Sequence, residues 1–192
     1  MKILWGVCGS FCNHEAVWQQ VEQMSSRWQI SAILSENTAR LDTRFSSAEQ
    51  RCQKLRQLTG RPLMTTLQEA ERTGPIDHFE AMIIAPATAT ELNKLTLGIY
   101  DTPVALAAKA MLRNERPVVL GIASNDFLGI SGVHLMTLKQ MRHIYLVPFR
   151  QDDWVNKPNS LVSEWTLIEP TLQAALQGRQ LQPVLLEGRG QP

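Results

Sequence analysis

A ten-residue stretch near the N-terminus, VCGSFCNHEA (residues 7–16), gathers the residue types in this sequence that most readily do chemistry. Its two cysteines and its histidine would suit a thiol redox pair or part of a metal site. Its Gly9-Ser10 pair would suit a phosphate, because small residues after a strand let the N–H groups of a following helix approach an anion. The class of function depends on which of these chemistries the stretch serves.

The cysteine spacing argues against the redox and metal interpretations. Cys8 and Cys12 are separated by three residues rather than the two of a thioredoxin-type pair, and Cys52 leaves an odd count. A structural zinc site needs four ligands, and no second cluster completes Cys8, Cys12 and His14. We therefore expect no metal and interpret the cysteines as small buried or loop residues. Among the histidines, His14 is the best candidate for a role at the site because it lies beside the Gly-Ser turn.

The overall composition is that of an ordinary globular protein. The chain has 192 residues, of which 44% are hydrophobic and 19% charged, with a formal net charge of +1. This balance gives no electrostatic footprint for nucleic acid or an acidic membrane surface, and no apolar run approaches the roughly 20 residues of a membrane span. We expect a soluble, cytoplasmic protein with a single domain over residues 1–192, divided into a core (1–150) and a C-terminal extension (151–192).

Short apolar runs alternate with helical patterns along the core. Strands are predicted at 2–7, 29–35, 81–87, 116–124 and 144–149, and helices at 13–28, 46–60, 65–74, 102–114, 133–143 and 170–178. Asn13, Ser46 with Glu49, and Thr66 with Glu69 are the expected N-terminal caps. This alternation indicates an α/β protein with a doubly wound parallel sheet, a Rossmann-like fold. The helix at 102–114 is apolar almost all round, so we also expect self-association.

Ligands bind doubly wound sheets at the carboxyl ends of the strands, so the residues that follow the strands are the candidates for a cofactor site. They are Gly9, Ser10, Ser35, Asn37, Ala87, Thr88, Thr90, Ser124 and Asn125. The alternative is that the hydroxyl groups only cap helices. The sequence has neither a complete G-x-G-x-x-G fingerprint nor a Walker motif, which disfavours NAD(P) or ATP held by this chain alone. A mononucleotide such as FMN, or another anion at the same place, fits better.

Three segments resemble the flavoprotein family, which includes FMN-dependent phosphopantothenoylcysteine decarboxylases and flavin prenyltransferases. They are GVCGS (6–10), APATATELNKLTLGIYD (85–101) and PVVLGIASND (117–126), at the first, third and fourth predicted strands. The resemblance covers residues 2–148. It implies a flavoprotein fold, an anion or FMN phosphate that faces Gly9, Ser10 and Thr88, and a trimer-based homo-oligomer.

A closer resemblance within this family is to the B subunits of dipicolinate synthases. It rests on TRF (43–45), DTPVALAAKA (101–110), RNERPVVLGIASNDFLG (113–129), HLM (134–136), VPFRQDD (147–153), KPNS (157–160) and QLQP (180–183). It implies that dihydrodipicolinate is oxidised to dipicolinate with NAD(P)+ in the mother cell of a sporulating bacterium. The implied partner is the dehydrogenase-like A subunit of dipicolinate synthase, which would bind NAD(P). Cations and fixed donors recognise such a planar dianion, and the candidates for substrate binding are Asn125, Arg150 and Lys157.

The sequence departs from the decarboxylase pattern at several positions. His78 lies too close to the third strand to match the family's catalytic histidine, and the substrate-flap cysteine has no counterpart after Pro148. Thr90 and Glu91 replace an Asn and a Thr of the family. No catalytic residue is therefore assigned. Two alternatives stay open: an independent FMN-dependent decarboxylase or prenyltransferase, and a non-catalytic scaffold subunit.

Overall fold

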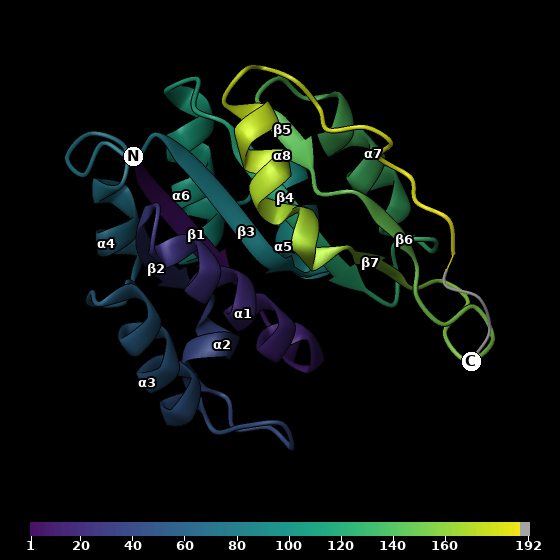
Figure 1. Cartoon of the computed structure of the whole chain (residues 1–192), viewed down its shortest axis with the longest axis horizontal. Helices are drawn as coiled ribbons and strands as arrows, with labels where there is room; N and C mark the ends of the chain where they lie inside the picture. The colour runs from purple at the N-terminus through teal and green to yellow at the C-terminus, as the bar shows by residue number, and fades with distance from the viewer. Residues whose placement is uncertain (189–192) are drawn as a thin grey trace.

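In the computed structural model, which describes residues 1–188, a parallel sheet forms the centre of the molecule (Figure 1). Its strands are β1 (Lys2–Val7), β2 (Gln29–Leu34), β3 (Ala81–Ala87), β4 (Val118–Ser124) and β5 (Ile144–Leu146). They pair in the order β2-β1-β3-β4-β5. The order reverses between β1 and β3, which is the switch point where doubly wound sheets bind ligands. The predicted fold class is confirmed.

The structure adds two short antiparallel strands that the sequence pattern does not predict. The run expected as one strand over residues 144–149 divides into β5 and β6 (Phe149–Gln151). Strand β6 pairs antiparallel with β7 (Leu161–Ser163), and β7 pairs antiparallel with the end of β4. Pro148 lies at the division, and proline lacks the N–H group that a continuous strand ladder needs.

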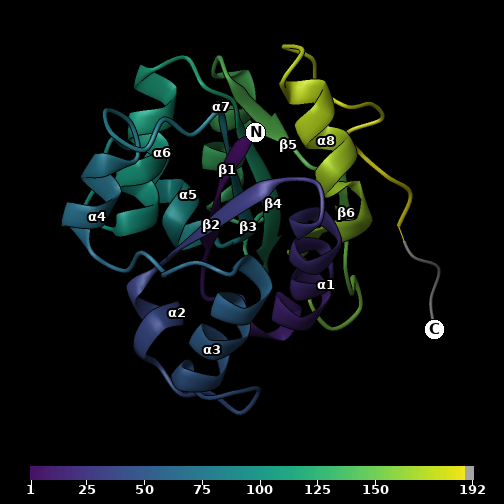
Figure 2. The same ribbon diagram turned by 60° about the vertical axis from the view of Figure 1, so that its left-hand side comes forward.

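Helices cover both faces of the sheet (Figure 2). On one face lie α1 (His14–Ser25), α3 (Ala48–Thr59) and α8 (Ile168–Ala175), and on the other lie α4 (Leu67–Arg72), α5 (Ala89–Thr96), α6 (Pro103–Arg113) and α7 (Gly132–Gln140). Successive strand residues point to opposite faces. Ile3 and Trp5 of β1 therefore pack with the first group of helices, whereas Leu4 packs with the second.

The start of α3 lies one residue later than the sequence predicts. The capping box consists of Ser47 and Gln50, not Ser46 and Glu49. Ser46 has another role, because both its carbonyl and its hydroxyl oxygen accept hydrogen bonds from the Arg51 guanidinium. The end of α3 and the capping box of α4 form where the sequence predicts them.

Helix α6 is buried by the chain itself. Thr102 caps it, with its Oγ1 atom accepting a hydrogen bond from the Ala105 amide at 3.1 Å, and α4 and α5 pack along it. Its apolar residues belong to the core between the sheet and these helices. The apolar composition of α6 is therefore explained within one chain and gives no separate reason to expect self-association.

The C-terminal extension packs back onto the α1 face of the sheet. Trp165, Ile168 and Leu172 are buried in the same cluster as Trp5. Trp165 lies directly over Gly121 of β4, where an added Cβ atom would be 3.0 Å from the Trp165 Cζ3 atom. The last residues of the extension, 189–192, lie outside the described part of the chain.

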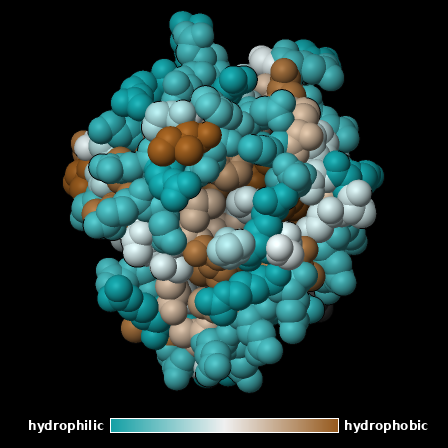
Figure 3. All heavy atoms as spheres, turned by 90° about the vertical axis from the view of Figure 1, so that its left-hand side faces the viewer, coloured by the Kyte–Doolittle hydropathy of each residue, from teal (hydrophilic) through white to brown (hydrophobic). Residues whose placement is uncertain are grey.

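The side of the molecule that carries α2 (Glu36–Arg40), α3 and α4 is largely hydrophilic, with apolar side chains gathered near its centre (Figure 3). Within residues 1–188, no helix combines the length and the apolar character needed to cross a membrane.

Candidate functional site

An open cavity of about 480 Å³ lies at the carboxyl ends of β1, β3 and β4. This is the sheet edge that the strand order identifies as the ligand site. The lining residues are Gly9, Ser10, Phe11, Cys12, Asn13, Arg44, Phe45, Thr88, Ala89, Thr90, Ala123, Ser124, Asn125, Asp152, Lys157, Ser160, Leu161 and Val162. The volume falls within the range of small-molecule sites.

The turn after β1 presents small residues and a hydroxyl group to the cavity. A short 3₁₀ helix, η1 (Phe11–Asn13), leads from this turn into α1. The Ser10 Oγ atom accepts a hydrogen bond from the Asn13 side-chain amide at 2.9 Å and makes no capping bond. Asn13 occupies the predicted N-cap position of α1, but its side chain does not cap the helix. It holds the Ser10 hydroxyl in place instead.

The hydroxyl group of Thr88 is also not used to cap a helix. Thr88 is the N-cap residue of α5, yet its side chain makes no capping hydrogen bond. By contrast, Ser35 caps α2, because its Oγ atom accepts a hydrogen bond from the Thr38 amide at 3.4 Å. The capping interpretation therefore describes Ser35, whereas Ser10 and Thr88 make no capping bond and line the cavity.

The remaining polar wall comes from α5 and the end of β4. Thr90 lies in the first turn of α5, Ser124 is the last residue of β4, and Asn125 follows it. The Ser124 Oγ atom accepts a hydrogen bond from the Asp126 amide at 3.3 Å, so its hydroxyl hydrogen can still be donated. These side chains bring further donors and acceptors to the same cavity as Ser10.

Three of the predicted cofactor residues do not line the cavity. Ser35 is buried and caps α2. Asn37 lies beside the turn, with its Cβ atom 3.8 Å from the position that a Cβ atom on Gly9 would occupy. Ala87, the last residue of β3, is fully buried. None of the three is therefore placed to contact a ligand in this cavity.

The two predicted substrate cations are placed differently. Lys157 lines the cavity, where its Nζ atom lies 3.7 Å from the Asp152 Oδ2 atom. Arg150 is absent from the lining and forms a salt bridge of 3.1 Å with Glu164. The Nε atom of Arg150 is buried and has no hydrogen-bond partner among residues 1–188.

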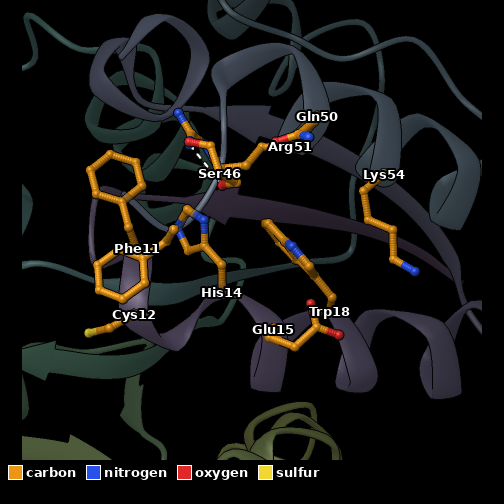
Figure 4. A pocket seen from close by; sticks show the side chains of 10 residues that line it. Phe11, Cys12, His14, Glu15, Trp18, Ser46, Gln50, Arg51 and Lys54 are labelled. Carbon is orange, nitrogen blue, oxygen red and sulfur yellow. Dashed lines mark hydrogen bonds between the residues drawn. The ribbon is translucent and has the colours of Figure 1, made fainter. Parts of the chain in front are cut away.

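A second cavity, of about 270 Å³, lies between α1 and α3 and shares Phe11, Cys12 and Phe45 with the first. Figure 4 shows the rings of Phe11, His14 and Trp18 in a row along one side, with side chains of α3 opposite them. The centre of the His14 ring lies 5.2 Å from that of Phe11 and 4.9 Å from that of Trp18. The imidazole is therefore enclosed between two aromatic rings.

His14 is a buried, neutral histidine. Its Nε2 atom lies 2.9 Å from the Cys8 carbonyl oxygen, which can only accept, so Nε2 carries the proton. Its Nδ1 atom is buried and has no hydrogen-bond partner within residues 1–188. Burial lowers the pKa of His14 to about 4; the bond to Cys8 opposes this shift and the charge of Arg51 adds to it. The ring is therefore uncharged at neutral pH and holds the turn by its single donor.

The cysteines are all free. Cys8 is buried, and burial raises the pKa of its thiol well above the ordinary value. Nearby Glu91 raises this pKa further, while the Thr88 amide opposes the change. Cys8 therefore stays a thiol rather than a thiolate nucleophile at neutral pH. Cys12 is exposed and lines both cavities. Across residues 1–188, no group of three or more His, Cys, Asp or Glu side chains is arranged to hold a metal ion.

The loop at residues 41–47 also contributes to the cavity wall, through Arg44 and Phe45. This loop follows α2 rather than a strand, so the pattern of strand ends does not predict its role. The one available signal was the TRF motif at 43–45, which contributed only to the resemblance.

Comparison with known proteins agrees with this geometry. Residues 1–163 match the model of the Flavoprotein family. The chain belongs to the flavoprotein family. This flavoprotein is 40% identical over 187 residues to the B subunit of dipicolinate synthase from Bacillus subtilis (strain 168), with 97% of this chain and 94% of the relative covered. It is also 25% identical over 151 residues to the flavin prenyltransferase UbiX of Campylobacter jejuni, with 77% and 79% covered.

Solved structures give the same relationship. The dipicolinate synthase B subunit from Bacillus halodurans superposes on this flavoprotein with a TM-score of 0.89 and 36% identity, covering 98% of this chain and 97% of that chain. The FMN-dependent cysteine decarboxylase SpaF superposes with a TM-score of 0.69 and 18% identity, covering 93% and 97%. The second likeness shows the shared fold alone. The resemblance to dipicolinate synthase B subunits that the motifs indicate is confirmed.

Proposed function

We propose that this chain is the B subunit of a dipicolinate synthase and that it acts together with the dehydrogenase-like A subunit of the same enzyme. The observation that carries the proposal is the 40% identity to the B subunit from Bacillus subtilis, which extends over nearly the whole length of both chains. The relatedness includes the C-terminal extension, which packs on β4 through Trp165. We assign the reaction to the cytoplasm of the mother cell in a sporulating bacterium.

In the proposed reaction, dihydrodipicolinate loses a hydride and a proton and becomes dipicolinate. NAD(P)+ accepts the hydride and becomes NAD(P)H, and the proton passes to solvent or to a basic group. The chain has no complete dinucleotide fingerprint. We therefore assign NAD(P) to the dehydrogenase-like partner, and the task of this chain would be to hold and orient ligands at the shared site.

We propose that the cavity at the carboxyl ends of β1, β3 and β4 binds FMN, a cofactor that supplies hydride-transfer chemistry when bound. The lining combines the polar groups of Ser10, Thr88 and Asn125 with the rings of Phe11 and Phe45. An amphipathic ligand with a phosphate and a flat ring needs this combination. The turn at Gly9-Ser10 would hold the phosphate, with Thr88 as an additional donor.

For the dicarboxylate substrate, we propose Asn125 and Lys157 as contacts. Both line the same cavity as the flavin residues. The Lys157 ammonium group shares its charge with Asp152 at 3.7 Å and would have to exchange this partner for a substrate carboxylate. Arg150 does not line the cavity, so we propose that it affects substrate binding only indirectly, through its salt bridge with Glu164.

The test is an assay of NAD(P)H formation from freshly prepared dihydrodipicolinate with the dehydrogenase-like partner alone, this chain alone, and the mixture. We expect activity only in the mixture, together with a flavin absorption band at about 450 nm in this chain. Full activity from the partner alone would reduce this chain to a scaffold. Full activity from this chain alone would contradict the assignment of NAD(P) to the partner.

A further inference from the structure

The loop at residues 41–47, between α2 and α3, brings a positive charge to the cavity. Arg44 and Phe45 of this loop both line the cavity wall next to the turn after β1. The guanidinium carbon of Arg44 lies 4.9 Å from the centre of the Phe45 ring. None of the salt bridges found within residues 1–188 includes Arg44. Its charge is therefore not neutralised by a neighbouring carboxylate.

A buried arginine fixes the conformation of this loop. Arg51 in α3 is only 2% exposed. Its guanidinium donates hydrogen bonds to the carbonyl oxygens of Thr38 at 3.2 Å, of Ser46 at 2.7 Å, and of Leu41. The same group lies 4.7 Å from the centre of the Phe11 ring (Figure 4). One side chain thus ties α2 and both ends of the loop to the turn after β1.

Burial of the Arg51 cation costs free energy that packing alone does not offset. Removing a charge from water is costly unless a partner compensates for it. None of the salt bridges within the described residues includes Arg51. Carbonyl oxygens, the Ser46 hydroxyl and an aromatic ring provide the close compensation, and the charge of Asp42 acts in the same direction. An apolar side chain would fill this space without desolvating a charge, but it could not bind three carbonyl groups at once. What the guanidinium adds is a defined path for the loop that carries Arg44.

We propose that Arg44 is an oxyanion-binding residue of the cavity and that Arg51 is the residue that positions it. The inference rests on the proposed function, because the expected ligands of the cavity are the phosphate of FMN and the carboxylates of the substrate. Both are oxyanions that a guanidinium binds through two parallel hydrogen bonds. Lys157, the other cation of the lining, already lies 3.7 Å from Asp152, whereas Arg44 is available to an incoming anion.

Paired ligands that differ only in the oxyanion test the role of Arg44. FMN is compared with riboflavin by flavin fluorescence titration, and dipicolinate with its uncharged analogue pyridine-2,6-dicarboxamide by calorimetry, for the wild type and for Arg44→Gln. We expect Arg44→Gln to lower the affinity for the ligand whose oxyanion Arg44 binds by roughly tenfold or more. The affinity for the paired ligand that lacks the oxyanion should not change. The pair that responds identifies the phosphate or the carboxylate as the ligand. Arg40→Gln is the matched control, because Arg40 pairs with Glu36 at 2.8 Å and is absent from the cavity lining.

A second variant tests the positioning role of Arg51. Arg51→Lys keeps the charge but cannot reach three carbonyl oxygens in different directions. We expect it to lower the affinity for the same ligand as Arg44→Gln does. The double variant should bind that ligand as tightly as Arg44→Gln alone. A purely structural role would instead lower the affinity for both members of each pair. Thermal melting of each variant verifies that the fold is intact.

Two results would overturn the proposal in distinguishable ways. If the wild type binds FMN or dipicolinate and Arg44→Gln binds every probe equally well, the role of Arg44 is wrong while the proposed function stands. If the wild type binds neither FMN nor dipicolinate, the proposed function fails, and the role of Arg44 fails with it.

Discussion

Ser10, Thr88 and Ser35 all follow strands of the same sheet, but only the Ser35 hydroxyl group caps a helix. Ser35 is bonded within α2. The other two make no capping bonds and line the cavity. At the scale of single residues, the site is therefore defined by polar groups that local structure leaves available.

Ser10→Asp should abolish binding of FMN or of free phosphate. The substitution places a negative charge at the turn where we propose that the phosphate binds, and like charges repel strongly where water is partly excluded. Fluorescence titration with FMN and calorimetry with phosphate measure the effect. The neutral variant Ser10→Asn, of similar size, is the control and should lose only part of the affinity. Unchanged affinity in Ser10→Asp would show that the anion binds elsewhere.

His14 should make the stability of the fold depend on pH. Its pKa in the folded protein is about 4, below the ordinary value of 6.5, so the unfolded chain binds the extra proton first as the pH falls. The contribution of His14 is thus fully present above pH 6.5 and is lost between pH 6.5 and about 4, up to a limit of about 3 kcal/mol of unfolding free energy.

Urea denaturation at a series of pH values measures this dependence. His14→Gln keeps a donor for the Cys8 carbonyl but does not titrate, so its loss of stability between pH 6.5 and 4 should be smaller than that of the wild type. His134→Gln, at a half-exposed position of α7, is the control and should follow the wild type. Parallel curves for wild type and His14→Gln would contradict the assignment.

At the scale of elements, β4 is the strand on which the core and the C-terminal extension meet. Gly121 lets the Trp165 ring and the Ala85 side chain approach this strand from the α1 face. Strand β4 also supplies Ser124 to the cavity and pairs with β5 and β7. Correct packing of the extension on this strand should therefore matter for the site as well as for stability.

Gly121→Ala should destabilise the protein by about 1–3 kcal/mol through overpacking. The added Cβ atom would lie 2.9 Å from the Ala85 Cβ atom and 3.0 Å from the Trp165 Cζ3 atom. In a chain of this size, each kcal/mol lowers the melting temperature by roughly 2–4 °C, which calorimetry detects. Gly9→Ala is the control, because its nearest contact would be an ordinary 3.5 Å. An unchanged melting temperature for Gly121→Ala would mean that Trp165 packs differently.

At the scale of the whole molecule, α7 and the loop before it expose several apolar side chains. Leu128, Ile130, Val133 and Met136 form this 128–136 patch, and they are 52%, 83%, 64% and 47% exposed. Exposed apolar patches of this kind are typical of contact surfaces between proteins. Together with the trimer-based assembly that the family resemblance implies, this leads us to expect a homo-oligomer that covers the patch.

Sedimentation at micromolar concentration should therefore give a mass above the 21.6 kDa of one chain. The double variant Ile130→Asp, Val133→Asp should shift the chain toward the monomer, because two buried charges would oppose association. Ile76→Asp, at an exposed position outside the patch, is the control and should leave the mass unchanged. A monomeric wild type would show that the patch has another role.

The packing of the extension is also relevant to the number of domains in the chain. Trp165 and Leu172 share one core with Trp5 of β1, which supports our proposal that the core and the extension form a single domain. The sequence predicts this only by the absence of a linker, because no local pattern shows where a helix such as α8 will pack.

The sequence by itself determined the fold class, because the apolar strands and the capping box of α4 are local signals that the chain satisfies wherever its segments pack. It also predicted at which edge of the sheet the cavity lies, since parallel strands bring their carboxyl ends to one edge. Only the tertiary structure decided which residues reach the cavity. Arg150 pairs with Glu164 outside the cavity, and the buried Arg51 brings Arg44 to it. These outcomes depend on partners far apart in the sequence or on loops without a periodic pattern, and no local signal encodes such contacts.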